Sequence, residues 1–139
     1  MRKSLLLLLI VTFFSCEKNE LNDLLPEVQV NETINMNLPE FTDLLTPSLS
    51  VETTGGINGL FIINRGSGNP PYKAYDRACP NNDCTSGLVF DGVFRLKCPC
   101  DDSEYNIVDS SPLTEGNSHF LREYKVIMLN EYTLNISNF

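Results

Sequence analysis

Apolar and polar residues alternate with a period of two over much of the chain from residue 28 onward. The alternation is clear in residues 28–30, in residues 34–38 and at the end of the chain, where Tyr132, Leu134 and Ile136 alternate with polar residues. A period of two sends neighbouring side chains to opposite faces of an extended chain, as in a half-buried β-strand. Further strands are predicted at residues 50–53, 60–63, 72–75, 88–90, 93–96, 105–108 and 124–129.

Turn-forming residues separate these strands. Residues 65–71 contain two glycines and two prolines and predict a loop. Asp91-Gly92, between two apolar segments, predicts a tight hairpin turn, and residues 130–131 predict another. Residues 41–45 predict a short helical turn or loop that ends at Pro47. We therefore expect an all-β domain of about eight to ten short strands, arranged as a small sandwich or a small barrel.

The N-terminus differs from the rest of the chain. Arg2 and Lys3 precede an apolar run, residues 5–14, which only Thr12 interrupts, and residues 17–20 are polar. A basic start followed by an apolar stretch of this length is typical of a signal peptide. A transmembrane helix needs roughly 20 apolar residues, about twice this run. A buried core helix does not fit the basic start.

Ser15 and Cys16, a small residue followed by a cysteine, stand where such a segment is cut. With them the segment resembles a bacterial lipobox, although Phe13 and Phe14 are bulkier than the usual residues there. The resemblance implies that residues 1–15 are removed and that Cys16 becomes an acylated N-terminus. The protein is then a membrane-anchored, extracytoplasmic lipoprotein, either periplasmic or surface-facing. Several acyl chains anchor a protein stably, and secretion without lipid is the alternative.

Cleavage at this point divides the remaining chain into a tether, residues 16–27, and a single domain, residues 28–139. The whole chain has 18 acidic and 10 basic residues and a formal charge of −8, and loss of Arg2 and Lys3 makes it more acidic. An acidic domain without basic clusters is not expected to bind nucleic acid or anionic lipid surfaces. We expect this charge mainly to keep an extracytoplasmic domain soluble.

The chain has five cysteines. Cys16 is assigned to the lipid, and the other four, Cys79, Cys84, Cys98 and Cys100, fall in one short stretch. An even number of cysteines in an oxidising compartment indicates two disulfides or a metal site. Four cysteines allow three pairings, and the sequence arithmetic does not choose among them.

The segments around these cysteines, residues 79–84 (CPNNDC) and 98–103 (CPCDDS), resemble the two loops of the Rieske family. In that family the loops read Cys-x-His-x-x-Cys and Cys-x-Cys-His-Gly-Ser. The first cysteine and the histidine of each loop hold a 2Fe-2S cluster, with both histidines on one iron, and the other two cysteines form a disulfide. The resemblance, which covers about residues 28–139, implies stacked antiparallel sheets with both cysteine loops at one tip.

Laid on this sequence, the Rieske pattern implies a role for each cysteine of the loops. Cys79 and Cys98 take the positions of the cluster ligands, whereas Cys84 and Cys100 take those of the disulfide. In an oxidising compartment, two thiols left without a cluster can close into a second disulfide if their Cα atoms come within about 7 Å. We therefore expect two disulfides, Cys84–Cys100 and Cys79–Cys98, each worth about 2–4 kcal/mol.

The sequence departs from the Rieske pattern at the histidines. Their positions hold Asn81 and Asp101, and the single histidine, His119, lies outside both loops, where we expect a strand or loop surface. An amide is a feeble ligand for iron, and a hard carboxylate suits the soft surroundings of the cluster poorly. We therefore expect no cofactor. The alternatives are a 2Fe-2S cluster with non-standard ligands, or a zinc or iron site of Cys79, Cys98 and Asp101 with Asn81.

Two other groups of side chains bear on partners. Acidic residues gather at the predicted tip, where they could hold calcium or dock a basic partner, although a solvated loop is the simpler role; they are Asp83, Asp101, Asp102 and Glu104. Phe120, Tyr124 and Tyr132 are expected in core positions of the final hairpin rather than in a ligand site. With His119 as the only histidine, no Ser-His-Asp catalytic set is supported.

These observations predict a lipid-anchored cell-envelope protein whose degenerate Rieske-like domain has a binding or structural role. We do not expect an enzyme. The alternatives from other classes are an electron-transfer protein, whose cluster would have non-standard ligands, and a small metal-binding domain. The acidic tip is the expected contact surface for an envelope protein that the sequence does not identify.

Overall fold

The computed structural model describes residues 24–139, so the predicted signal peptide and Cys16 lie outside the described residues. Within residues 24–139 there is no helix long and apolar enough to span a membrane. Apart from one short 3-10 helix, η1 (Pro39–Leu45), the described regular structure consists of antiparallel β-strands. The predicted all-β fold class is confirmed.

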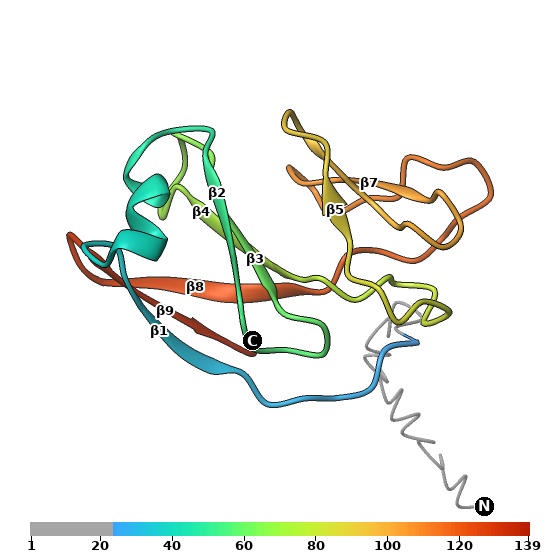
Figure 1. Cartoon of the computed structure of the whole chain (residues 1–139), viewed down its shortest axis with the longest axis horizontal. Coiled ribbons are helices and arrows are strands. Elements are labelled where there is room, and N and C mark those ends of the chain that lie inside the picture. The colour runs from blue at the N-terminus through green and yellow to red at the C-terminus, as the bar shows by residue number, and fades with distance from the viewer. Residues whose placement is uncertain (1–23) are drawn as a thin grey trace, which may run out of the picture.

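Six strands form one large, curled antiparallel sheet (Figure 1). Only two residue pairs, Ala74↔Tyr124 and Tyr75↔Glu123, join its two halves across β4 and β8. In order across the sheet the strands are β1 (Asn31–Asn35), β9 (Thr133–Ser137), β8 (Glu123–Asn130), β4 (Tyr72–Asp76), β3 (Leu60–Asn64) and β2 (Ser50–Thr53).

A second, three-stranded sheet lies beside the large one (Figure 1). It consists of β5 (Val89–Phe90), β6 (Arg95–Lys97) and β7 (Glu104–Asn106), in that order. The chain enters it from β4 through the first cysteine loop, and the second cysteine loop joins β6 to β7. The small sheet therefore brings the two cysteine loops to one tip, as predicted.

Strand β3 contributes side chains to both hydrophobic clusters of the domain. Leu60 and Ile62 pack into a cluster enclosed by the large sheet, whereas Phe61 and Ile63 pack into a second cluster with residues of the small sheet. Alternate residues of a strand point to opposite faces, so a strand that is buried on both faces needs a continuous apolar run. The sequence Leu-Phe-Ile-Ile meets this requirement.

Two sequence predictions about these elements are wrong. The first strand is Asn31–Asn35 rather than residues 28–30 and 34–38, because the Val30 N–H is bonded to the side chain of Asn138 and lies outside the ladder with β9. In the final hairpin, Tyr124 is buried as expected, but Phe120 and Tyr132 are 42% and 40% exposed. Phe120 lies in the loop before β8, and Tyr132 lies in the turn before β9.

A buried carboxylate, Asp76 at the end of β4, ties three parts of the fold together. Its Oδ2 accepts hydrogen bonds from the Ile57 N–H (2.7 Å) and the Tyr124 hydroxyl (2.8 Å). Its Oδ1 accepts from the Ala78 N–H (2.8 Å) and the Asn58 N–H (3.2 Å). A buried charged group is tolerated when its lone pairs are satisfied in this way.

Gly56 is required beside this carboxylate. It has φ +60, and a Cβ atom there would lie 2.3 Å from Asp76 Oδ2.

The Tyr124 hydroxyl stays protonated and can donate to Asp76. Burial, followed by the hydrogen bond to Asp76, raises the pKa of this hydroxyl.

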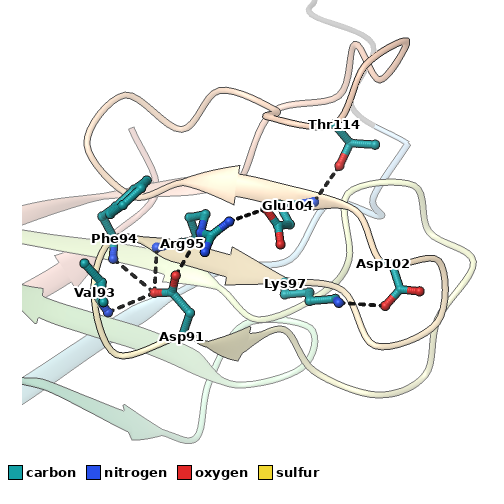
Figure 2. A network of polar contacts seen from close by, with 8 residues as sticks. All are labelled: Asp91, Val93, Phe94, Arg95, Lys97, Asp102, Glu104 and Thr114. Atoms are coloured by element: carbon teal, nitrogen blue, oxygen red, sulfur yellow. Dashed lines mark hydrogen bonds and ion pairs between the residues drawn. The ribbon is translucent and has the colours of Figure 1, made fainter.

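Polar contacts of a single aspartate shape the small sheet (Figure 2). Asp91 Oδ1 accepts from the N–H groups of Val93, Phe94 and Arg95, and its Oδ2 accepts from Arg95 Nε at 2.9 Å. The ladder closes at Phe90↔Leu96, so the predicted tight turn at Asp91-Gly92 is wrong. The connection is longer because the Asp91 side chain accepts hydrogen bonds from the N–H groups of Val93, Phe94 and Arg95. In a two-residue turn these N–H groups would belong to the strand that follows.

We expect Asp76→Asn to lower the free energy of unfolding by about 2–3 kcal/mol, because the new amide group donates where donors already point at it. Tyr124→Phe removes a bond to the charged group and should cost about 1.5–3 kcal/mol. The matched control is Tyr75→Phe, which removes a hydroxyl bonded to the neutral carbonyl of Ile107 and should cost only about 0.5–1.5 kcal/mol. Denaturant unfolding measures all three, and an equal loss in the two tyrosine variants would contradict the role of Asp76.

We expect Asp91 to contribute to stability in a pH-dependent way. Partial burial by itself raises the pKa of Asp91, but the hydrogen bonds from the N–H groups of Arg95 and Val93, from the Arg95 guanidinium and from the Phe94 N–H lower it to about 2. Because the folded pKa lies below the unfolded value, this stabilisation is present above about pH 4 and is lost as the pH falls toward 2.

The measurement compares the free energy of unfolding of the wild-type chain and of Asp91→Asn between pH 7 and pH 2. The difference should be constant above about pH 5 and should shrink between about pH 4 and pH 2. Asp43→Asn is the control, since Asp43 is exposed and its side chain has no hydrogen bond within residues 24–139. A pH-independent difference for Asp91→Asn would disprove the assignment.

Candidate functional site

The two cysteine loops meet where the small sheet joins the large one. The first loop leaves β4 at Arg77 and returns at Leu88, whose N–H is bonded to the Arg77 carbonyl. The second loop is a tight turn closed by hydrogen bonds from Cys98 N to Ser103 O (2.8 Å) and from Asp102 N to Cys98 O (3.1 Å). Asp102 has a positive φ of 60, which aspartate tolerates better than most residues.

In the structure Cys79 is joined to Cys98, with Cα atoms 5.6 Å apart, and Cys84 is joined to Cys100, with Cα atoms 5.7 Å apart. Both Cα separations are usual for disulfides. Cys79 and Cys98 are buried in the core cluster that contains Tyr75, whereas Cys100 is exposed. The inner pair is therefore part of the core, and the outer pair closes the tip above it.

The residues at the histidine positions bind each other. Asn81 Nδ2 donates to Asp101 Oδ2 at 2.5 Å, and Asp101 Oδ1 accepts from the Ser103 N–H at 2.9 Å. Partial burial alone raises the pKa of Asp101, but the hydrogen bonds from Ser103 and Asn81 outweigh this effect and hold the pKa below its ordinary value. The carboxylate of Asp101 thus serves as an acceptor that holds the two loops together.

His119 also lies at this site. Its Nδ1 is 3.0 Å from Asn81 Oδ1, and the residue is half-buried. The sequence places His119 correctly outside the two loops but does not predict this contact. The segment after β7 folds back over the tip through hydrogen bonds from Asn117 Nδ2 to the Tyr105 hydroxyl and from Leu121 N to Ser110 O. No spacing in the sequence signals such a return.

These residues do not fit a 2Fe-2S cluster. The cluster needs two thiolates and two imidazoles, and here both sulfur atoms at the ligand positions are joined to each other. The amide of Asn81 directs a donor at Asp101 rather than a lone pair at a metal. The chain contains a single histidine, so two imidazole ligands are not available in one molecule.

Two groups of potential metal ligands occur in the described residues. The Sγ atoms of Cys79, Cys84 and Cys98 lie within 4.8 Å of one another, and Cys98 also forms such a group with Asp83 and Asp101. A thiolate, not a disulfide sulfur, is the metal ligand. With the cysteines paired, only two exposed carboxylates remain in the second group, too few for a firm site.

The acidic residues at the tip are largely engaged within the protein. Asp102 pairs with Lys97 at 2.8 Å and Glu104 pairs with Arg95 at 2.7 Å (Figure 2). Asp101 accepts from Asn81 and Ser103, as described above. Most of the predicted acidic contact surface therefore carries partly neutralised charge.

Comparison with known proteins finds a likeness in structure only. The sequence matches no protein-family model, and no curated protein matches it. One similar solved structure is the ferredoxin of carbazole 1,9a-dioxygenase from Nocardioides aromaticivorans IC177, with 13% identity and a TM-score of 0.49 over 81% of this chain and 100% of that chain. Another is a putative NADH-dependent nitrite reductase small subunit from Mycobacterium tuberculosis, with 12% identity and a TM-score of 0.49 over 81% of this chain and 98% of that chain.

Proposed function

We propose that this chain is a lipid-anchored cell-envelope protein whose Rieske-like domain has a non-catalytic, binding or structural role and carries no cluster. The observation that carries the proposal is that the four ligand positions satisfy one another. Cys79 is bonded to Cys98, and Asn81 is bonded to Asp101. A cluster would require all four groups to turn toward a common centre, which breaks both contacts.

The disulfides replace the cluster as the connection between the loops. In the Rieske pattern the cluster and one disulfide join the two loops, and here two disulfides do so. Each closes a stretch of chain, with sequence separations of 19 and 16 residues, and is worth about 2–4 kcal/mol by constraining the unfolded chain. A small domain gains most from such links, because its hydrophobic core is limited.

The two alternatives from the sequence, electron transfer through a cluster with non-standard ligands and a small metal-binding domain, make different demands on the same residues. Both require Cys79 and Cys98 as thiolates. Both therefore exclude the inner disulfide, so the redox state of this one pair separates the proposal from its alternatives.

We expect protein purified from the envelope, without added iron and without reductant, to be colourless and to give no low-temperature EPR signal on reduction. Non-reduced peptide mapping should recover Cys79–Cys98 and Cys84–Cys100. A brown protein with an EPR signal would establish the electron-transfer alternative. Free thiols at both Cys79 and Cys98, with bound zinc or iron detected by metal analysis, would establish the metal-binding alternative.

The membrane anchor is tested separately. We expect mass spectrometry of the mature N-terminus to find acyl groups on Cys16 and to find residues 1–15 absent. Cys16→Ser should move the protein from the membrane fraction to the soluble fraction, because the acyl chains supply the membrane affinity. Ser15→Ala, which keeps a small residue before the cysteine, is the control and should remain in the membrane fraction. An intact segment 1–15 in the mature protein would contradict the anchor.

A further inference from the structure

Arg65, which directly follows β3, is a charged side chain without an acceptor in the described residues. Its Nε is buried and has no hydrogen-bond partner, and no ion pair includes the residue. The other described arginines all have partners. Arg77 pairs with Glu52, Arg95 pairs with two carboxylates, and Arg122 donates to the Leu25 carbonyl.

An unpartnered guanidinium is unexpected in this chain. Acidic residues outnumber basic ones by 18 to 10, yet none of those in residues 24–139 forms an ion pair with Arg65. The residue is half-buried, and its buried Nε–H has no acceptor among residues 24–139. Unsatisfied charged donors of this kind are costly, and in a native structure such a group needs an explanation.

Beside Arg65 lies a cavity of about 230 Å³ between the large and small sheets. Its walls are largely apolar, with Ile63 and Ile107 buried behind it and three exposed apolar side chains around it, beside the exposed Ser48 and Ser67. The exposed apolar side chains are Val93, Phe94 and Val108, which are 70%, 45% and 56% exposed. Apolar side chains gathered around one cationic group are typical of a site that binds a molecule with an anionic end.

The walls of the cavity are held in place before any ligand arrives. Val93 and Phe94 lie in the connection between β5 and β6, where the carboxylate of Asp91 binds both of their N–H groups (Figure 2). Ile107 is fixed from the other side, because its carbonyl accepts the Tyr75 hydroxyl at 2.7 Å. A preformed site of this kind loses little entropy on binding.

We propose that this cavity binds the carboxylate of a small aliphatic acid, with the carboxylate on the Arg65 guanidinium and the hydrocarbon chain against Val93, Phe94 and Val108. The planar guanidinium matches a carboxylate through two parallel hydrogen bonds. The cavity is smaller than the roughly 300–1,000 Å³ of sites for drug-sized ligands, which favours a short chain. The site goes beyond the proposed function, and its lining includes no residue of the cysteine loops.

The test is an NMR titration of the ¹⁵N-labelled protein with hexanoate and two matched controls. Hexanamide has the same chain without the charge, and acetate has the charge without the chain. Hexanoate should shift the Arg65 Nε–Hε signal together with the amide signals of Val93, Phe94 and Val108. Both controls should bind at least tenfold more weakly. No shift with hexanoate up to about 10 mM, a concentration at which a 1 mM site is about 90% occupied, would overturn the proposal, as would equal affinity for hexanamide.

Variants identify the groups responsible. Arg65→Gln should weaken hexanoate binding at least tenfold, and Lys97→Gln, which removes the same charge from an exposed residue paired with Asp102, should leave it unchanged. Val93→Ser should weaken binding without loss of stability, since Val93 is largely exposed. If Arg65→Gln does not fold, the comparison of hexanoate with hexanamide on the wild-type protein still decides. Unchanged binding in a folded Arg65→Gln, or equal loss in Lys97→Gln, would reject the site.

Discussion

The buried carboxylate of Asp76 is the interaction on which the rest of the structure depends. Four donors converge on it, from the turn after β2, from the start of the first cysteine loop and from β8. A carboxylate taken out of water must be satisfied by hydrogen bonds, so these three segments cannot move apart without a large cost. The Ala78 N–H is one of the donors, and Cys79 is the next residue. The position of the inner disulfide therefore follows from the satisfaction of a charge in the large sheet.

The other half of that disulfide is positioned by the small sheet. Cys98 follows β6 directly, and its N–H is bonded within the turn to Ser103. Asp91, Arg95 and Glu104 link all three strands of the small sheet by charge-assisted hydrogen bonds (Figure 2). Each cysteine thus comes from a different cysteine loop. The disulfide joins the two loops, and Asn81 and Asp101 are hydrogen-bonded across the same junction.

The predictability of this structure divides between local and distant interactions. Period-two segments and the apolar run of β3 are local patterns, and they place β2, β3, β4 and β8 to within one residue. The prediction of a tight turn at Asp91-Gly92 is wrong because the preference of Asp-Gly for such turns reflects backbone conformation. Here the Asp91 side chain accepts hydrogen bonds from three N–H groups. The contact of His119 with Asn81 spans 38 residues. The lack of an acceptor for Arg65 Nε among the described residues depends on which side chains the tertiary fold places beside it. Neither feature has a sequence signature, since each depends on how the loops return in three dimensions.

The hydrogen bonding of polar groups differs between the cysteine tip and the cavity beside Arg65. At the cysteine tip all four cysteines are paired, and Asp101 accepts hydrogen bonds from Asn81 and Ser103. At Arg65 the reverse holds, because the guanidinium Nε is buried and has no hydrogen-bond partner among residues 24–139. Proteins seldom leave buried charged donors unsatisfied, and such a group beside a largely apolar cavity is suited to a ligand that supplies the missing acceptor. The resemblance of the cysteine loops to a cluster site thus draws attention to one end of the domain, whereas the unsatisfied chemistry lies between the two sheets.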